Sequence, residues 1–390
     1  MYQPLGLLYI AAAAKEACRT VKFIDCREGE KYKETLPLEM QQSRYVGFTA
    51  TTPELAFCIE WAKRCYNATI IGGPHATLRP QDCEGHFDYV VVGEGEQVIR
   101  AILADYYEVQ PRTIRPPRIK NLDDVPIPDW EITGNGFSPT LFPGERYGLG
   151  PPAATMILSR GCPFSCAFCG NWLRTPVVYR SVENIEKEID YLVGKGVQHF
   201  RFEDDNLTIH PDLKDLCKML QSKAIHFKAH TRSDLVKAPI MVMLKEAGLE
   251  EFGLGIESAD DDVLMLNRKK ETVAQHLEAC RIIKKAGIRL KTYFMSGLPG
   301  ETGQTLQLNM EFVRKAKPDK WTLSIFTPYP GCDIFASPEQ YGVHIIDKDL
   351  SHYWNFPDAF TYELDTADRE ILERRYRRFY KWLVEETWRK

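Results

Sequence analysis

The chain has 390 residues, of which 44% are hydrophobic and 27% are charged, a composition typical of globular proteins with one or more cores. Its formal net charge of −4 excludes a general electrostatic attraction to nucleic acid or to an anionic membrane surface. The sequence contains neither a secretory signal peptide nor an apolar run of about 18 residues. We therefore expect a cytoplasmic protein without a membrane span.

The first part of the chain, residues 1–105, alternates short apolar segments with helical ones. The expected strands are 20–25, 45–50, 68–73 and 89–93, and the expected helices are 5–18, 53–66 and 96–105. Uniformly apolar strands joined through helices indicate a parallel sheet that is covered on both faces. We predict an α/β fold whose N-terminal domain is a doubly wound parallel sheet, with ligands at the carboxyl ends of its strands.

Residues 106–150 contain many prolines and little periodicity, and we interpret them as a linker. The alternation resumes, with longer helices, in residues 151–327. Strands are expected at 155–159, 199–204, 226–231, 250–257, 289–297 and 320–326, and helices at 182–195, 211–223, 238–247, 272–286 and 302–316. Six strand–helix units predict a partial (β/α)6 barrel of the TIM type, since a closed barrel needs eight.

A helical C-terminal extension, residues 328–390, begins with loops and ends in a helix expected at 366–388. One face of this helix is aromatic and the other is rich in arginine, a pattern typical of a surface helix that packs on its own domain. A basic lid or a contact with nucleic acid is the alternative that the sequence leaves open.

Three of the eleven cysteines are clustered in the sequence GCPFSCAFCG, at Cys162, Cys166 and Cys169. Disulfides are disfavoured in a reducing compartment, and a structural zinc site needs a fourth ligand. No second C-x2-C unit exists in the chain. Three thiolates without a fourth ligand fit an iron–sulfur cubane with one open iron, because soft sulfur ligands favour such clusters.

The C-x3-C-x2-C motif, with Phe168 before its last cysteine and in a loop after the first expected barrel strand, resembles the radical S-adenosylmethionine superfamily. The resemblance implies a [4Fe-4S] cluster on Cys162, Cys166 and Cys169, with S-adenosylmethionine bound to the open iron. It also implies that reduction of this cofactor yields a 5′-deoxyadenosyl radical, which abstracts a hydrogen atom from the substrate. A reductant such as flavodoxin or ferredoxin is the implied protein partner.

Segments at the ends of later barrel strands resemble the same family. They are RFEDDN (201–206), HTRSD (230–234), GLGIES (253–258) and SGLPGET (296–302). The residues that the resemblance places around S-adenosylmethionine are Phe168, Glu203, Asp204, Arg232, Glu257, Met295 and Gly297.

The resemblance also implies a role for each of these strand-end groups. Glu203 and Asp204 are expected near the amino group of the cofactor and Arg232 near its carboxylate. Glu257 is expected near the ribose hydroxyls, and Met295 with the turn 297–299 near the adenine. Simpler interpretations are a structural ion pair for Arg232, a turn cap for Glu257 and a tight turn for the glycines.

The N-terminal segments PLGLLYIAAAAKEA, VGFTATTPE, IIGGPHATLRP and VVVGEGE resemble the cobalamin-binding domain that accompanies one branch of the superfamily. The implied cobalamin contacts are Thr49, Thr51, Thr52, Gly72, Gly73, Pro74, His75, Gly93, Glu94 and Gly95. Glycines after strands allow the backbone to approach a bulky ligand. No D-x-H-x-x-G motif offers a lower cobalt ligand, and His75 belongs to the expected tail-binding loop, with a loop histidine bonded to the backbone as the simpler interpretation.

Relatives of this kind carry a further strand before the PLGLLY segment, whereas only three residues precede it here. We therefore expect either a Rossmann-like sheet that lacks its first strand or a vestigial domain.

Cobalamin beside a radical generator implies methylation of an unactivated carbon or phosphorus centre, with a small molecule as the expected substrate. Cyclisation or rearrangement without methyl transfer, a cobalamin-free enzyme that modifies RNA, and a sensor that binds the cofactors are the alternatives. Cys332 and Tyr329, in the segment TPYPGCDIF, are the candidates for a catalytic hydrogen donor. An ordinary loop position is the simpler interpretation of both residues.

Overall fold

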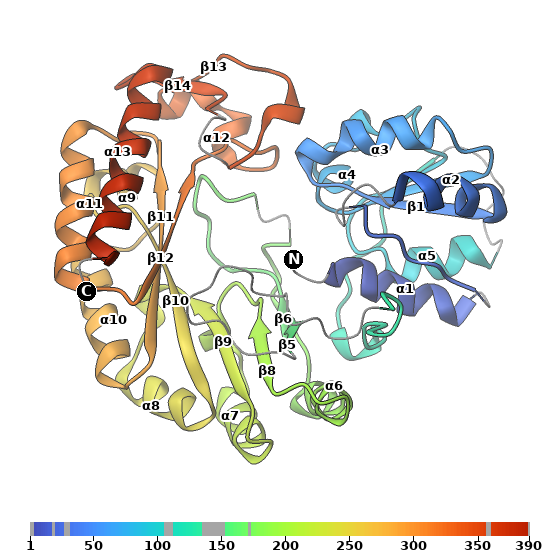
Figure 1. Ribbon diagram of the computed structural model, residues 1–390, viewed down its shortest axis with the longest axis horizontal. Coiled ribbons are helices and arrows are strands. Elements are labelled where there is room, and N and C mark those ends of the chain that lie inside the picture. Colours follow the sequence, from blue (N-terminus) through green and yellow to red (C-terminus); the bar gives the residue numbers. More distant parts are fainter. Residues whose placement is uncertain are drawn as a thin grey trace. The chain divides into compact units, whose positions relative to one another are not determined.

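The computed structural model describes residues 4–17, 20–26, 32–104, 112–134, 153–170, 173–355 and 360–388, with side chains up to residue 386. The chain divides into two compact units, coloured blue to cyan and green to red in Figure 1 except for one helix. The first unit comprises residues 1–155 and 178–197, and the second comprises residues 156–177 and 198–390. Each unit is described by itself below.

The first unit is built on a parallel sheet with the strand order β1-β2-β3-β4. Its strands are β1 (Tyr45–Thr49), β2 (Ala68–Gly72), β3 (Tyr89–Val91) and β4 (Arg112–Ile114). Its helices are α1 (Leu5–Ala17), α2 (Tyr32–Gln42), α3 (Leu55–Ala62), α4 (Pro74–Leu78), α5 (Glu96–Leu103) and α6 (Val182–Gly194). The predicted doubly wound arrangement is confirmed, because neighbouring residues of one strand enter different cores.

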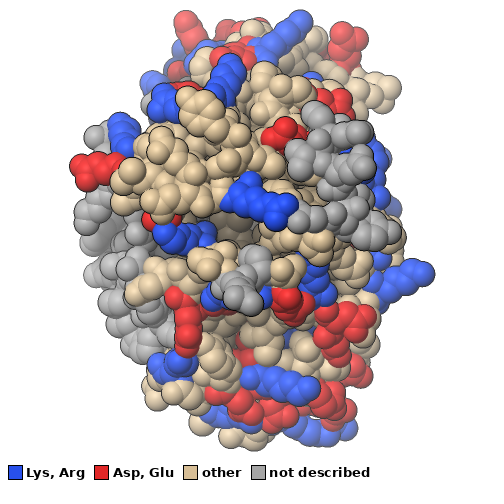
Figure 2. Space-filling model, turned by 90° about the vertical axis from the view of Figure 1, so that its right-hand side faces the viewer, with Lys and Arg blue, Asp and Glu red and all other residues tan. Residues whose placement is uncertain are grey.

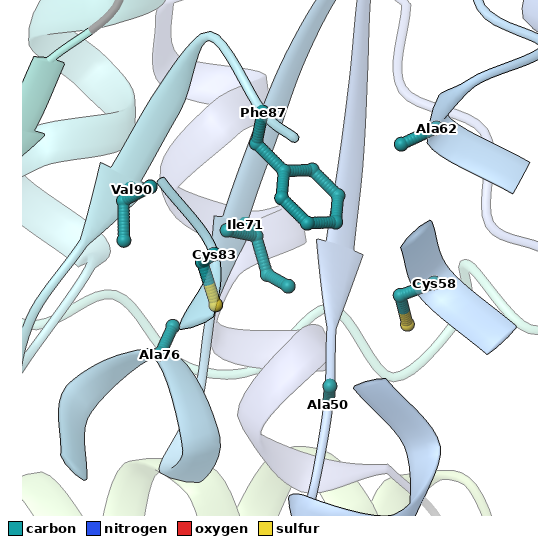
Figure 3. Close-up of a cluster of buried hydrophobic side chains, with 8 residues drawn as sticks. All are labelled: Ala50, Cys58, Ala62, Ile71, Ala76, Cys83, Phe87 and Val90. Carbon is teal, nitrogen blue, oxygen red and sulfur yellow. The ribbon is translucent and has the colours of Figure 1, made fainter. Parts of the chain in front are cut away.

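Ile71 and Val90 belong to the cluster drawn in Figure 3, which α3 and α4 complete. Ile70 and Tyr89 enter a second cluster with residues of α5. Strands buried on both faces explain why β2 and β3 are uniformly apolar in sequence.

One predicted strand of this unit is absent, and two of the unit's elements were not predicted. Residues 20–25 form no strand, although Ile24 packs against the core beside Trp61. In the order 2-1-3-4-5 of such sheets the second strand pairs only with the first. No first strand occurs among the described residues, so residues 20–25 have no ladder to join.

The two elements that were not predicted are the strand β4 and the helix α2. The strand β4 lies inside the expected linker, where the backbone of Arg112 donates to Asp88 O (2.8 Å) and that of Val92 to Ile114 O (2.9 Å). Its three residues are too short to show a period. The helix α2 contains Pro37, a residue that is unfavourable in a helix interior.

The second unit contains a six-stranded sheet with the order β12-β11-β10-β9-β8-β5, which curls into a partial barrel (Figure 1). Residues 153–155 of its edge strand β5 fall within the bounds given above for the first unit. Its strands are β5 (Ala153–Met156), β8 (His199–Phe202), β9 (His226–Thr231), β10 (Leu249–Glu257), β11 (Arg289–Ser296) and β12 (Lys320–Ile325). Its helices are α7 (Leu213–Ser222), α8 (Ala238–Glu246), α9 (Asp261–Leu266), α10 (Val273–Lys285), α11 (Gly303–Ala316), α12 (Asp333–Ala336) and α13 (Arg369–Trp388). The four short strands outside both main sheets are β6 (Ser159–Arg160), β7 (Val178–Tyr179), β13 (Val343–Ile345) and β14 (Tyr362–Leu364). The expected partial barrel with six strands is thereby confirmed.

The two faces of the barrel sheet differ in character. On β11, Phe294 packs edge-on against Phe312 of α11 and Phe379 of α13, so its face is the one that the helices cover. Tyr293 and Met295 are only partly buried and lie on the opposite, inner face, because side chains alternate along a strand. The inner face is where the polar strand-end residues gather.

The helix α13 packs as a surface helix of the second unit, as its sequence indicated. Phe379 and Leu383 are fully buried, and the Arg314 guanidinium of α11 lies 5.2 Å from the ring centroid of Trp382. Among the described residues, no helix is long and apolar enough to cross a bilayer. Figure 2 shows acidic and basic side chains intermingled on the face that it presents, in keeping with the small net charge.

Candidate functional site

The cysteine segment forms a tight loop that begins at Gly161. This glycine has φ +111°, and a Cβ atom built on it would lie 2.5 Å from Leu173 O, so a side chain cannot be accommodated. The next residue, Cys162, donates its backbone N–H to Arg174 O at 2.8 Å. The two ends of the loop are therefore held together by backbone contacts.

The guanidinium of Arg174 occupies the centre of this loop. It donates to the carbonyl oxygens of Phe164 (3.3 Å), Cys166 (3.3 Å) and Cys169 (2.5 Å). Carbonyls that point to one cation fix the path of the chain between the cysteines. Sequence reasoning missed Arg174, although an arginine shortly after a cysteine motif is a detectable signal.

Two of the three thiol groups of the loop, those of Cys162 and Cys166, face hydrogen-bond donors from the barrel. Asn206 Nδ2 lies 3.5 Å from Cys162 Sγ, and Arg232 Nη1 lies 3.6 Å from Cys166 Sγ. Such donors favour sulfur that carries negative charge, as thiolates bound to iron do. Among the described residues, no three His, Cys, Asp or Glu side chains surround a single ion position. A cubane does not need such a position, because each thiolate binds its own iron, so the donor set fits the expected cluster.

Arg232 connects the end of β9 to this loop. Its guanidinium lies 3.9 Å above the ring of Phe164 and pairs with Asp234 (3.0 Å) and Glu271 (3.4 Å). These ion pairs match the simpler interpretation of Arg232, and its expected contact with a carboxylate of the cofactor stays a prediction. Phe168, the aromatic residue singled out by the motif, is half-buried in the same loop.

The adjacent carboxylates that follow β8 behave differently. Asp204 is buried and accepts hydrogen bonds from Leu158 N (3.1 Å) and Ser159 Oγ (2.5 Å), and burial raises its pKa to about 6. Asp204 therefore secures the turn after β5, and its predicted contact with the cofactor is untested. Burial also raises the pKa of Glu203, but His230 and Arg201 outweigh this effect and the pKa lies below its ordinary value.

Glu203 is the better candidate for binding an ammonium group, because its side chain is 30% exposed and it stays ionised. It lies 3.6 Å from His230 Nε2, and His230 Nδ1 is 3.2 Å from Tyr293 Oη. A Cβ atom on Gly253 would lie 2.7 Å from both His230 and Tyr293. The first glycine of GLGIES thus makes room for a polar pair on the inner face.

Glu257 ends β10 in an unusual backbone conformation. Its φ of +63° lies in the left-handed region, which costs energy for a residue other than glycine. The pairing of β10 with β11 shifts register between Gly255 and Glu257. Burial raises the pKa of Glu257, and Lys269, 3.4 Å away, opposes that rise. Strain of this kind is typical of functional positions.

The turn after β11 is held by a carboxylate and by the C-terminal extension. Gly297, with φ +83°, donates its N–H to Glu301 Oε2 at 2.8 Å, and its carbonyl accepts from Tyr362 Oη at 2.7 Å. The carbonyl of Glu301 accepts from Thr366 Oγ1 (2.7 Å) and Arg375 Nη1 (3.1 Å). The expected adenine turn is thereby packed against the extension, while Met295 lies on the inner face just before it.

The two catalytic candidates of the extension lie in less suitable positions. Cys332 is 1% exposed and caps α12, where its Sγ accepts from Phe335 N at 3.3 Å. Burial raises the pKa of Cys332 and that of Tyr329, which is partly buried. Both stay untested as hydrogen donors, and the cap explains Cys332 without any chemistry.

In the first unit, the expected cobalamin residues lie at the carboxyl ends of β1, β2 and β3, which are neighbours in the sheet. Gly73 has φ +91°, and a Cβ atom on it would lie 2.3 Å from Thr49 Oγ1. Gly93 has φ +100° and donates its N–H to Thr77 Oγ1 at 3.0 Å. Glycines with positive φ that follow two neighbouring strands, Gly73 after β2 and Gly93 after β3, fit a bulky ligand.

The threonines and the histidine of this unit have separate roles. Thr49 and Thr51 are exposed, and Thr51 begins a capping box with Glu54. Thr52 is buried, and its Oγ1 lies 3.2 Å from His75 Nδ1, while His75 Nε2 faces Asp82 at 3.3 Å. Burial lowers the pKa of His75. These partners match the simpler interpretation of His75, and its predicted contact with cobalamin is untested.

The remaining residues of the set pack within the unit. Pro74 begins α4, and a Cβ atom on Gly95 would lie 3.0 Å from Ile10 Cδ1, which marks a close approach of α1. The buried Glu94 accepts from Ile119 N (2.8 Å) and pairs with Arg118 (2.8 Å). Glu94 therefore fixes the segment after β4, and its predicted contact with cobalamin is untested.

Comparison with known proteins identifies both units. The Radical SAM superfamily matches residues 156–313, and the B12 binding domain matches residues 1–103. The chain therefore belongs to the radical S-adenosylmethionine superfamily, in the branch that carries a cobalamin-binding domain. A [4Fe-4S] cluster, S-adenosylmethionine and cobalamin are its cofactors, as the sequence resemblance implied.

Individual relatives agree with this assignment. An uncharacterized methyltransferase of Pyrococcus horikoshii is 29% identical, over 84% of this chain and 76% of its own length. The anaerobic magnesium-protoporphyrin IX monomethyl ester cyclase of Cereibacter sphaeroides is 28% identical, over 100% of this chain and 69% of its own. The structure of the radical S-adenosylmethionine methyltransferase TsrM of Kitasatospora setae superimposes with a TM-score of 0.68 and 16% identity, over 88% of this chain and 74% of its own.

Proposed function

We propose that the protein transfers a methyl group from S-adenosylmethionine, by way of cobalamin, to an unactivated carbon of a small molecule. The observation that carries the proposal is a three-thiol loop, faced by donors from the barrel, in a chain that also has a B12-binding unit. Bound together, the cluster and S-adenosylmethionine supply a radical that abstracts hydrogen, and cobalamin supplies the methyl group.

The thiols of Cys162, Cys166 and Cys169 hold the cluster in this proposal, and Arg174 keeps their loop folded. Glu203 binds the amino group of S-adenosylmethionine, because it is ionised and accessible. Glu257 binds the ribose hydroxyls. A carboxylate accepts hydrogen bonds from both kinds of group.

The inner face of the barrel supports a polar substrate. Several charged or polar side chains share the inner face with Glu203. The strand pairing places Lys291 opposite Gly253, Gly253 opposite His230, and Lys228 opposite Arg201. Because side chains alternate along a strand, Arg201, Lys228, His230 and Lys291 all lie on this face. Charged walls of this kind bind polar or ionic groups better than hydrocarbon. We therefore favour a polar small molecule over a lipid.

The similar cyclase makes radical cyclisation without methyl transfer the second candidate. The two reactions differ in the fate of the methyl group, which can be followed without knowing the substrate. The protein is reconstituted anaerobically with iron, sulfide and hydroxocobalamin and is then incubated with a strong reductant and methyl-deuterated S-adenosylmethionine.

Methyl transfer predicts deuterated methyl on the cobalamin together with release of S-adenosylhomocysteine. Release of 5′-deoxyadenosine while the cobalamin stays unlabelled would contradict methyl transfer and favour cyclisation.

Glu257→Gln is expected to weaken the binding of S-adenosylmethionine by about tenfold, since a hydrogen bond to a charged group contributes about 1.5–3 kcal/mol.

A further inference from the structure

The segment 267–271, with the sequence NRKKE, connects parts of the site that lie far apart in sequence. Asn267 O accepts a hydrogen bond from Ala167 N of the cysteine loop at 2.9 Å. Asn267 Nδ2 donates to Pro299 O, in the turn after β11, at 2.9 Å. A single residue therefore joins the cysteine loop to the expected adenine turn.

The same segment also holds the end of β9. Arg232 Nη2 donates to Lys269 O at 2.8 Å, and Asp234 N donates to Glu271 Oε1 at 3.0 Å. Arg232 further pairs with the Glu271 carboxylate at 3.4 Å. The segment 267–271 therefore holds residues at several strand ends in place, and it is called the frame below.

The backbone of this frame is strained around Lys269. Its neighbours Arg268 and Lys270 have φ values of +52° and +57°, in the region that residues other than glycine rarely adopt. Lys270 is exposed, whereas Lys269 is 5% exposed. The strain places one lysine inside the site and leaves the next one in solvent.

The ammonium of Lys269 lies between two carboxylates. Its Nζ is 3.4 Å from Glu257 Oε1 and 3.3 Å from Glu271 Oε2. Burial lowers the pKa of Lys269, but the two carboxylates outweigh this effect and the pKa lies above its ordinary value. Lys269 is therefore charged at neutral pH.

The sequence at Gly255 fits this arrangement. A Cβ atom there would lie 2.4 Å from Glu257 Oε1 and 3.1 Å from Lys269 Nζ. The second glycine of GLGIES thus leaves the space in which the carboxylate and the ammonium meet. Gly255, the strained Glu257 and the buried Lys269 therefore lie together at the end of β10.

We propose that Lys269 is a positioning residue of the S-adenosylmethionine site, which orients the Glu257 carboxylate for contact with the ribose hydroxyls. The inference rests on the proposed role of Glu257 in binding the ribose. It adds that the orientation of Glu257 is imposed from the frame at 267–271 and not by β10 alone.

The test measures the affinity of the reconstituted holoenzyme for S-adenosylmethionine and for its 2′-deoxy and 3′-deoxy analogues, by equilibrium dialysis. The variants are Lys269→Met and, as a matched control, Lys270→Met, which changes the exposed neighbour with the same backbone strain. We expect Lys269→Met to bind S-adenosylmethionine about tenfold less tightly, because a hydrogen bond to a charged group is lost. Lys270→Met should bind it like the parent protein.

The analogues separate a positioning role from general damage. In the parent protein, removal of one ribose hydroxyl is expected to weaken binding about tenfold. In Lys269→Met the same removal should cost nothing further, because the two changes break one interaction and their effects are not additive. Equal losses in both proteins, or unchanged affinity in Lys269→Met, would overturn the inference.

Two further variants keep the test decisive. Lys269→Gln keeps a donor in place, so it should fold if Lys269→Met does not and should retain part of the discrimination between hydroxyl and deoxy ligands. Glu257→Gln tests the underlying assignment. If Glu257→Gln leaves that discrimination intact, the role of Glu257 is wrong. If it removes the discrimination while both Lys269 variants keep it, the role of Lys269 alone is wrong.

Discussion

The strand ends of the two units differ in how they prepare for a ligand. In the second unit, charged groups are held by one another, as Arg232 is by Asp234 and Glu271. In the first unit, the strand ends carry glycines with positive φ and exposed threonines. A small charged cofactor needs fixed charges in fixed places, whereas a bulky one needs space along the backbone.

The difference has a consequence for mutation. Substitutions in the second unit should act through charge and metal binding, and substitutions in the first should act through volume. The predictions below test this contrast, beginning with the largest effect.

Loss of a cluster thiol should be the most severe change. Cys166→Ala removes the buried sulfur that faces Arg232 Nη1, and we expect loss of most of the iron and of all S-adenosylmethionine cleavage. Iron and sulfide analysis after anaerobic reconstitution measures the effect. Cys65→Ala, in the first unit, is the control and should keep the full iron content. A Cys166→Ala protein with normal iron content would refute the role of this loop.

In the first unit, added volume should weaken the binding of cobalamin. Gly73→Ala introduces a Cβ atom 2.3 Å from Thr49 Oγ1 at a residue with φ +91°. Such strain costs about 1–3 kcal/mol, so the affinity for hydroxocobalamin should fall about tenfold or more. Absorption spectra after gel filtration report the bound cobalamin.

The matched control is Gly47→Ala on β1, where a Cβ atom would meet nothing within 4 Å. The iron content of both variants should equal that of the parent protein. If Gly73→Ala instead lost iron and kept cobalamin, the contrast between the two units would be wrong.

The sequence predicted regular elements better than it predicted the contacts around the site. The strands of the barrel were found because apolar runs alternate with helices of ordinary length, and β9 was predicted at the bounds that it has. The strand β4 was missed because three residues carry no pattern. Residues 20–25 have the composition of a strand, but among the described residues they have no neighbouring strand with which to pair. Composition cannot show whether a pairing strand is present.

The candidate site shows the same limit. Motif resemblance selected Arg232 and Glu257, both of which contact Lys269 of the segment 267–271. It did not select Lys269 itself, Asn267 or Arg174. Their positions depend on left-handed backbone at Arg268 and Lys270 and on contacts between segments that are distant in sequence. Neither the composition of the sequence nor its hydrophobic periodicity indicates such contacts. The same resemblance selected Asp204, whose carboxylate accepts hydrogen bonds from Leu158 N and Ser159 Oγ.

The C-terminal extension offers a milder test of the charged unit. Tyr362→Phe removes the phenol that donates to Gly297 O and leaves a buried carbonyl without this donor. The cost of about 1–3 kcal/mol should weaken the binding of S-adenosylmethionine about fivefold or more, with the iron content unchanged. Tyr380→Phe on α13 is the control, because Tyr380 is 47% exposed. Equal affinities in both variants would show that the turn is independent of the extension.

The last prediction concerns the pH dependence of stability and involves no change in cofactor binding. Burial raises the pKa of Glu301 to about 7, above the ordinary value of 4.5. The folded protein therefore keeps this proton over a pH range in which the unfolded chain has lost it, and the free energy of unfolding falls as the pH rises from about 4.5 to 7. The loss is on the order of 3 kcal/mol.

Glu301→Gln removes this titration and keeps an acceptor for Gly297 N. Thermal unfolding at pH 5 and at pH 8 measures the consequence. We expect the melting temperature of Glu301→Gln to fall less than that of the parent protein between these two values, because the amide has no proton to lose. Asp260, which lies close enough to raise the pKa of Glu301, stays in both proteins and cancels in the comparison. A parallel fall in both proteins would mean that Glu301 is ionised in the fold, stabilised there by Arg375 and the backbone of Gly297.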